Sequence, residues 1–352
     1  MFQQLCPGLF STRSEHTAGT SRTEAALSRR SLRLVRLGAT LLLACAATLD
    51  LVNAQQIWRG VGTPALHAQA PGERPEFSWP IVKGEYPRLR GLTSTFGESR
   101  VDHFHNGLDI AASGDPVHPV APGFILYSRT PSDDPFAPEQ GPGNFVYLYH
   151  GQGWYSGYYH LQSGEALVRS GNVKPTTPIG QAGNTGHSGG PHLHFFITAE
   201  NGRKIINPLY LLPPATDENP PIIGQINIIT PAGRTLVSHS RAERIRLTKR
   251  YPILLNIIDP GLEPYTRRGV YRLSWKLKGG VATDYNFSSI TYRDGDWRLE
   301  GGQVFDQVFQ YNLYKLNGLE FQNGRNELIV RAEDHSGNIT EVLFDVTVDR
   351  EY

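Results

Sequence analysis

Histidines that share a short stretch of the chain are the first candidates for chemistry. Eight of the twelve fall between positions 103 and 194: His103, His105, His118, His150, His160, His187, His192 and His194. Two belong to His192-Leu193-His194, which precedes the apolar run 195–197. Residues i and i+2 of a strand point to one face, so both imidazoles should face one site while Leu193 turns to the core. Neutral imidazole nitrogens are zinc ligands at ~2.0–2.1 Å.

A second pair is His105 and Asp109, separated by Asn-Gly-Leu. In a fully extended strand, residues four apart lie ~13 Å from each other, too far to bind one ion. The chain must therefore bend, and Gly107 permits the bend. Together with one histidine of the His-Leu-His pair, the site would have two histidines, one aspartate and an open fourth position, which is typical of catalytic zinc. An all-cysteine site is excluded, because the only cysteines are Cys6 and Cys45.

His160 ends the aromatic run 154–160. Zinc-dependent hydrolysis needs a group that accepts a proton from water and a group that stabilises the oxyanion. The chain has no His-Glu-x-x-His motif. His160 and His192 are therefore the candidates for these roles; the alternative is that they only support the ligands from the second shell.

Short strands are expected around these residues. Runs 144–149, 154–160 and 192–198 are aromatic or β-branched and bounded by Gly, Pro or Asn, and no convincing helical period occurs in this region. Pro-rich and acidic residues at 213–221 predict a stiff connector. Further strands are expected at 222–230, 253–258, 270–277, 328–332 and 342–348, with turns at 323–324 and 336–338. Their number and spacing predict a β-sandwich.

The N-terminal residues predict export. Arg29, Arg30, Arg33 and Arg36 precede an uncharged run, 37–49, and Val52-Asn53-Ala54 offers a cleavage site. The run is shorter than the ~20 apolar residues of a spanning helix. Two alternatives stay open: a retained short anchor, or lipidation at Cys45. We therefore expect a periplasmic, cell-envelope or extracellular protein that meets a membrane only through this segment. A net charge of +1 gives no general attraction to nucleic acid.

Residues 77–212 resemble the lysostaphin and LytM type of zinc metallopeptidase. The resemblance rests on Phe96-Gly97, HNGLD at 105–109, GNFVYLYHG at 143–151, YYHL at 158–161 and GNTGHSGGPHLHF at 183–195. It implies a compact antiparallel β domain of the duplicated hybrid motif fold, with a groove over the metal, that hydrolyses stem peptides or cross-links of bacterial peptidoglycan. It also implies that His105, Asp109 and His194 bind zinc and that His160 and His192 are catalytic. The sequence does not decide which of these two is the base. The long acidic loop 131–142 departs from the family pattern and leaves the cleavage preference open.

The last strands, from Asn323 to Val348, resemble the final hairpin of bacterial Ig-like domains. The expected order is a signal peptide or anchor at 1–54, a linker at 55–76, the peptidase domain at 77–212, a Pro-rich linker at 213–221 and an Ig-like sandwich at 222–352. The sandwich has no catalytic cluster, so a protein or glycan partner and a plain spacer role are alternatives. A second reading of the whole chain is a non-catalytic or latent envelope protein that activates or scaffolds other wall hydrolases.

Overall fold

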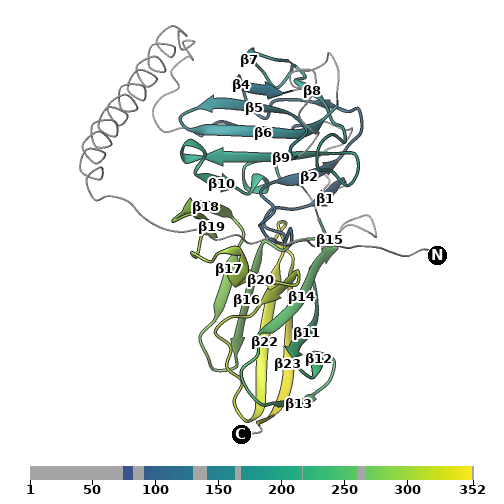
Figure 1. Cartoon of the computed structure of the whole chain (residues 1–352), viewed down its shortest axis with the longest axis vertical. Helices are drawn as coiled ribbons and strands as arrows, with labels where there is room; N and C mark the ends of the chain where they lie inside the picture. The colour runs from purple at the N-terminus through teal and green to yellow at the C-terminus, as the bar shows by residue number, and fades with distance from the viewer. Residues whose placement is uncertain are drawn as a thin grey trace, which may run out of the picture. The chain divides into compact units, whose positions relative to one another are not determined.

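The structure, a computed structural model, describes residues 74–81, 91–129, 141–162, 168–215, 217–260 and 267–350. Figure 1 shows that the described chain is built almost entirely of strands. The predicted signal segment 1–54, both cysteines and most of the predicted linker 55–76 lie outside the described residues. Among the described residues, no helix is long and apolar enough to cross a membrane.

The peptidase-type region forms the larger part of an extended sheet. Its central strands, in spatial order, are β10 (Lys204–Ile206), β9 (His192–Ala199), β6 (Trp154–Leu161), β5 (Asn144–Gly151), β4 (Gly123–Arg129) and β7 (Gly171–Val173). On the same edge of β9 as β10, opposite β6, lies β2 (Leu108–Ala111), which pairs in turn with β1 (Leu92–Ser94). Every one of these pairings is antiparallel. A separate small ribbon joins β3 (Pro116–Val117) to β8 (Gly180–Gln181).

Alternating side chains give this region its core. Along β5, burial alternates residue by residue, and Val146 and Leu148 are completely buried. Strand β9 lies in the interior of the sheet, with Leu193 and Ile197 among its buried apolar residues. These side chains belong to one apolar cluster together with Leu108 and other residues of the same region. The predicted strands at 144–149, 154–160 and 192–198 are confirmed, each with a slightly later end.

The C-terminal region consists of two further sheets. One contains β12 (Gly233–Val237), β11 (Ile222–Thr230), β14 (Ile253–Pro260), β21 (Leu313–Lys315) and β20 (Phe309–Gln310), with β15 (Arg267–Arg268) beside β14. The other contains β13 (Glu243–Leu247), β23 (Ile339–Arg350), β22 (Gly324–Glu333), β16 (Arg272–Leu277) and β17 (Thr283–Asn286). Ile226 and Leu255 of the first sheet and Leu273 and Val330 of the second share one apolar cluster, so the region is a sandwich. The five strands predicted here are all present.

One hairpin of the C-terminal region joins the other sheet. Strands β18 (Ser289–Arg293) and β19 (Asp296–Leu299) form it, and β18 pairs antiparallel with β10, Ile290 lying opposite Ile205. Within the described residues, this addition makes the peptidase-region sheet ten-stranded. The described residues also contain the short helix α2 (Phe305–Val308) and the 3₁₀ turns η2 (Glu200–Gly202) and η3 (Pro208–Tyr210). The sequence did not predict that this hairpin joins the peptidase-region sheet.

Candidate metal centre and active-site groove

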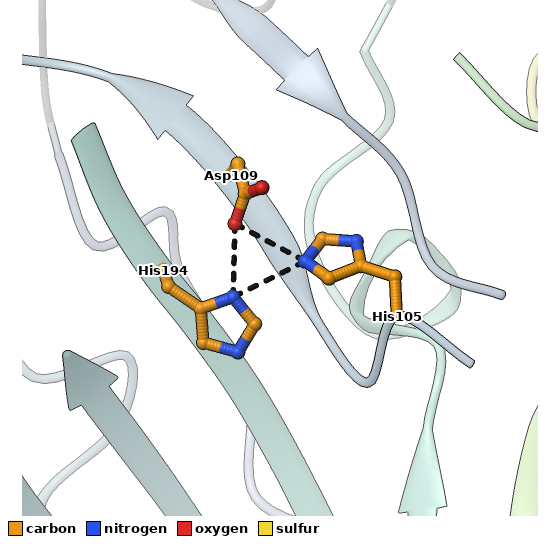
Figure 2. Close-up of side chains that lie close together, drawn as sticks. All are labelled: His105, Asp109 and His194. Carbon is orange, nitrogen blue, oxygen red and sulfur yellow. Dashed lines mark hydrogen bonds and ion pairs between the residues drawn. The ribbon is translucent and has the colours of Figure 1, made fainter. Parts of the chain in front are cut away.

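Three side chains predicted as zinc ligands converge on one point (Figure 2). His105 Nε2 lies 3.1 Å from Asp109 Oδ1 and 3.1 Å from His194 Nδ1. His194 Nδ1 lies 2.8 Å from the same Asp109 oxygen. Four bonds of ~2.0–2.1 Å at tetrahedral angles place neighbouring ligand atoms about 3.3 Å apart. The observed triangle is close to this size, so the three donors fit a zinc ion.

Strand register explains the first half of this convergence. In the antiparallel pair β2–β9, Asp109 lies directly opposite His194, and Ile110 lies opposite Leu193. Directly opposed residues of such a pair project to the same face with their Cβ atoms about 5 Å apart. Asp109 and His194 therefore share the site face, while Ile110 and Leu193 enter the core as their burial shows.

A bend before β2 brings in the third donor. His105 lies ahead of the strand, and Gly107 packs tightly against β9. A Cβ atom at position 107 would lie 2.4 Å from the Phe195 carbonyl oxygen and 3.1 Å from His194 Nε2. The sequence predicted that Gly107 permits the bend; the structure shows that its missing side chain also permits close approach to β9.

Hydrogen bonds and burial set the state of the ligands. His105 is 3% exposed, and its Nδ1 donates to the Thr95 carbonyl at 2.7 Å, which leaves Nε2 to face the site. Burial lowers the pKa of His194 to about 4, so its imidazole is neutral at pH 7, as a metal ligand must be. Burial by itself would raise the pKa of Asp109, but His105 and His194 outweigh it and hold that pKa well below its usual range.

His160 reaches the site because β6 carries a bulge. Val146 pairs with Tyr158 and Asn144 pairs with Leu161, so two residues of β6 oppose one of β5. His160 has φ of +62°, a left-handed conformation that is uncommon for residues other than glycine. Bulges often re-aim a side chain beside an active site, and here consecutive residues 159 and 160 both line one cavity. The sequence placed His160 at the end of this strand but gave no signal for the bulge.

The rings of His160 and His192 lie side by side, with centroids 4.8 Å apart. His160 Nδ1 donates to the Thr185 carbonyl at 2.8 Å, and His192 Nδ1 donates to the Gly190 carbonyl at 2.8 Å. In both rings Nε2 is thus left as the acceptor nitrogen. His192 Nε2 lies 3.7 Å from Asp109 Oδ1. Burial lowers the pKa of His160, which favours the neutral ring that can accept a proton.

The three ligand candidates, His160 and His192 all line one cavity of about 860 Å³. Tyr159, His103 and His187 also line it. Tyr158 is buried, and its hydroxyl accepts from the Val120 amide. His150 is structural: its Nδ1 donates to the Pro122 carbonyl at 2.9 Å, and its Nε2 lies 2.7 Å from Ser156 Oγ.

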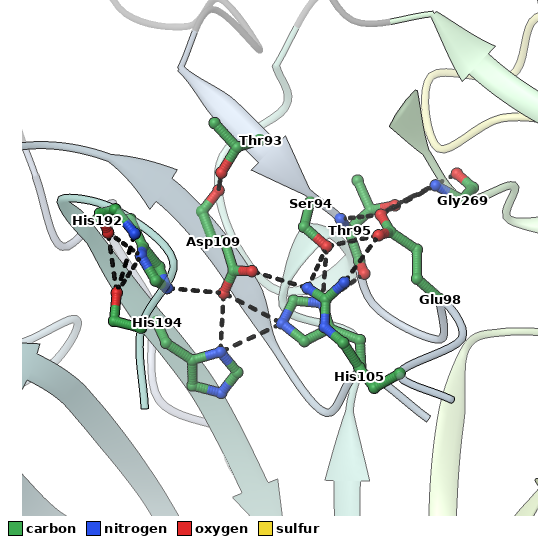
Figure 3. Close-up of polar contacts among 12 residues, drawn as sticks. Thr93, Ser94, Thr95, Glu98, His105, Asp109, His192, His194 and Gly269 are labelled. Carbon is green, nitrogen blue, oxygen red and sulfur yellow. Dashed lines mark hydrogen bonds and ion pairs between the residues drawn. The ribbon is translucent and has the colours of Figure 1, made fainter. Parts of the chain in front are cut away.

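Sequence reasoning missed two charged residues beside the ligands. Arg100 Nη2 donates to Asp109 Oδ2 at 2.8 Å and also lines the cavity. Glu98 accepts a hydrogen bond from Ser94 Oγ at 2.5 Å, and Ser94 Oγ lies 3.2 Å from His105 Nδ1 (Figure 3). Neither residue belongs to a recognisable motif, so only the folded chain shows their role.

Comparison with known proteins agrees with this geometry. The sequence model of peptidase family M23 matches residues 103–208, a range that contains all three ligand candidates and both further histidines. Residues 103–208 are thus similar to peptidase family M23. Members of the family are zinc metallopeptidases, and the cluster of His105, Asp109 and His194 fits their zinc site. A second family model, without a functional description, matches residues 220–349.

Curated relatives match only part of this chain. Cell division protein DipM of Caulobacter vibrioides is 34% identical over 39% of this chain and 21% of its own length. Peptidoglycan DD-endopeptidase ShyA of Vibrio cholerae is 38% identical over 26% of this chain and 19% of its own length. The chain thus spans about a fifth of both relatives. The crystal structure of a zinc-containing peptidase from Vibrio cholerae is 27% identical, with a TM-score of 0.31 over 38% of this chain and 39% of that one.

Proposed function

We propose that the protein is a zinc metalloendopeptidase that hydrolyses stem peptides or cross-links of bacterial peptidoglycan. His105, Asp109 and His194 hold the zinc, and His160 and His192 are the catalytic residues. The observation that carries the proposal is the convergence of three donor atoms, each within 3.1 Å of the others, in a cavity that two further imidazoles, those of His160 and His192, also line. Two histidines and one carboxylate leave a coordination position open, as catalysis requires.

The residues of the chain divide the chemistry between them. Zinc, when bound, supplies a Lewis acid that polarises a peptide carbonyl and activates water for attack. His160 and His192 line the same cavity, so one can take the proton from the attacking water on Nε2 and later give it to the leaving amine, while the other, with a proton from solvent on Nε2, donates a hydrogen bond to the oxyanion. Their Nδ1 atoms are held by the carbonyls of Thr185 and Gly190, which keeps both rings oriented before substrate binds. The two roles remain unassigned between the two residues.

The peptidoglycan substrate is supported by relatives and not by the cavity itself. ShyA is named a peptidoglycan DD-endopeptidase, and it is 38% identical to this chain over 93 residues. An exported protein would meet such a substrate in the periplasm, the envelope or outside the cell, which agrees with the predicted signal at 1–54. The C-terminal sandwich, proposed to be Ig-like, would bind a protein or glycan of the envelope or act as a spacer.

Purified full-length protein incubated with isolated sacculi tests this function. We expect soluble peptide-containing fragments whose masses identify one class of cleaved peptide bond. Sacculi with different stem and cross-link chemistry serve as the substrate panel. Stoichiometric zinc with no released fragment from any sacculus would instead support the second candidate, a non-catalytic or latent envelope protein that activates or scaffolds other hydrolases.

A further inference from the structure

We propose that the C-terminal sandwich positions the first zinc ligand, and that Glu98 is the residue through which it does so. The segment concerned is residues 95–105, called here the ligand loop because it ends at His105. The inference rests on the proposed function, in which His105 binds zinc. It adds a positioning residue that contacts no metal and assigns the second region a part in the metal site.

The buried aromatic residues of the ligand loop belong to the core of the C-terminal region. Phe96 is 0% exposed and Phe104 is 3% exposed, and both lie in the apolar cluster that contains Trp275. The ring of Phe104 packs against Phe305 at a centroid distance of 5.4 Å. Leu108 and Ile110, which follow the loop, belong instead to the cluster of the peptidase region. The loop therefore buries its apolar side chains in a different core from the strand that it precedes.

The Glu98 carboxylate connects the two regions (Figure 3). One of its oxygens accepts from the Gly269 amide at 3.0 Å, from Thr95 Oγ1 at 2.9 Å and from the Thr95 amide. Gly269 comes directly after β15 of the C-terminal region. Because an ionised carboxylate accepts charge-assisted hydrogen bonds, which are shorter and stronger than neutral ones, this contact is more than surface packing.

The second Glu98 oxygen faces the metal site. It accepts from Ser94 Oγ at 2.5 Å and lies 3.5 Å from Arg100 Nη1. Arg100 in turn donates to Asp109 Oδ2 at 2.8 Å. The loop also supplies the Thr95 carbonyl, which accepts a hydrogen bond from His105 Nδ1. One carboxylate thus links the C-terminal backbone to the partners of two proposed ligands, and such partners fix ligand orientation.

The junction has no spare room. A Cβ atom on Gly269 would lie 2.7 Å from Glu98 Cγ, and one on Gly97 would lie 2.5 Å from Phe287 Cδ1. Gly97 also has φ of +84°, which favours glycine. Ser99 Oγ donates to Asn312 Oδ1 at 2.8 Å further along the loop. Contacts with the C-terminal region therefore occur at residues 95–99 and at Phe104, so displacing the region must displace the loop.

Two variants of the full-length chain test the proposal. Glu98→Gln keeps the shape and removes the charge opposite Arg100, and Gly269→Ala pushes against Glu98 from the C-terminal side. Gly301→Ala is the matched control: a methyl there meets only the end of the Gln303 side chain, 2.7 Å away. Zinc affinity is measured by competition with a chromophoric chelator, amide protection of 95–105 by hydrogen exchange, and global folding by thermal unfolding.

We expect both variants to raise the zinc dissociation constant roughly tenfold or more, the range typical of lost second-shell contacts. Amide protection should fall in 95–105 but not in strands β5 and β6, and Gly301→Ala should match wild type in all three measurements. A folded Glu98→Gln protein with wild-type zinc affinity and wild-type protection of 95–105 overturns the inference. Should wild type bind no zinc, the proposed function fails, whereas unchanged loop protection in both variants would still refute the positioning role separately.

Discussion

Gly107→Ala should open the metal site without replacing a ligand. A methyl at this position would lie 2.4 Å from the Phe195 carbonyl oxygen and 3.1 Å from His194 Cε1 and Nε2. To reach a contact of about 3.0 Å, the backbone at Gly107 and strand β9 must separate by roughly 0.6 Å, because overlap at shorter range is strongly repulsive. That movement acts on ligand atoms only 2.8 to 3.1 Å apart.

The expected size of the effect follows from this displacement. Binding sites must be held within ~0.5 Å of the productive geometry, and this shift exceeds that tolerance. We expect the zinc dissociation constant to rise roughly 10- to 100-fold, as when ligand orientation is lost. Overpacking should lower the free energy of unfolding by about 1–3 kcal/mol.

Chelator competition measures the affinity, and denaturant unfolding measures the stability. Gly189→Ala is the control, since Gly189 lines the same cavity but a methyl there meets nothing within 4 Å. If the Gly107→Ala protein binds zinc as tightly as wild type, the close approach of Gly107 to β9 does not set the ligand geometry, and the reasoning is refuted.

Two further predictions concern other histidines. The His160→Ala and His192→Ala proteins should keep zinc but lower turnover on sacculi roughly 10²- to 10⁴-fold, as loss of a general acid or base does. His103→Ala, at the cavity wall, is the control. Loss of metal in either variant would instead make that residue a zinc ligand or a support of one. Burial lowers the pKa of His150 to about 4 from an ordinary 6.5. Between pH 4 and pH 6.5, the unfolded chain therefore binds a proton at this histidine that the folded chain does not bind. The residue's contribution to the free energy of unfolding, about 3 kcal/mol, should be present above pH 6.5 and be lost as the pH falls to 4. Urea unfolding of wild type and His150→Gln across this range should show a smaller acid loss in the variant, and equal slopes would contradict the assignment.

The sequence predicted the elements that carry the site because their signals are local. Strand alternation placed His192 and His194 on one face, and the required bend between His105 and Asp109 followed from strand rise alone. Both features depend on residues within a few positions of one another. The spacing of these residues alone predicted a site of two histidines and one aspartate. The family resemblance was needed only to say which histidine of the His-Leu-His pair is the ligand.

Other features depend on contacts between distant segments, which no local pattern encodes. The bulge that turns His160 into the cavity is a mismatch between β5 and β6 and is visible only once the two strands pair. The joining of β18 to β10 and the hydrogen bond from Gly269 to Glu98 bring together residues more than 80 positions apart. Arg100 and Glu98 were missed for the same reason, because their significance comes from the partners that they reach.

The most direct test of the account measures zinc content and hydrolysis on the same protein samples. His105→Ala, Asp109→Ala and His194→Ala are compared with wild type by metal analysis and by mass spectrometry of fragments released from purified sacculi. The account predicts zinc in wild type near one ion per chain, little in the three variants, and fragment release that falls with the zinc. Full fragment release by a variant that holds no metal would contradict it.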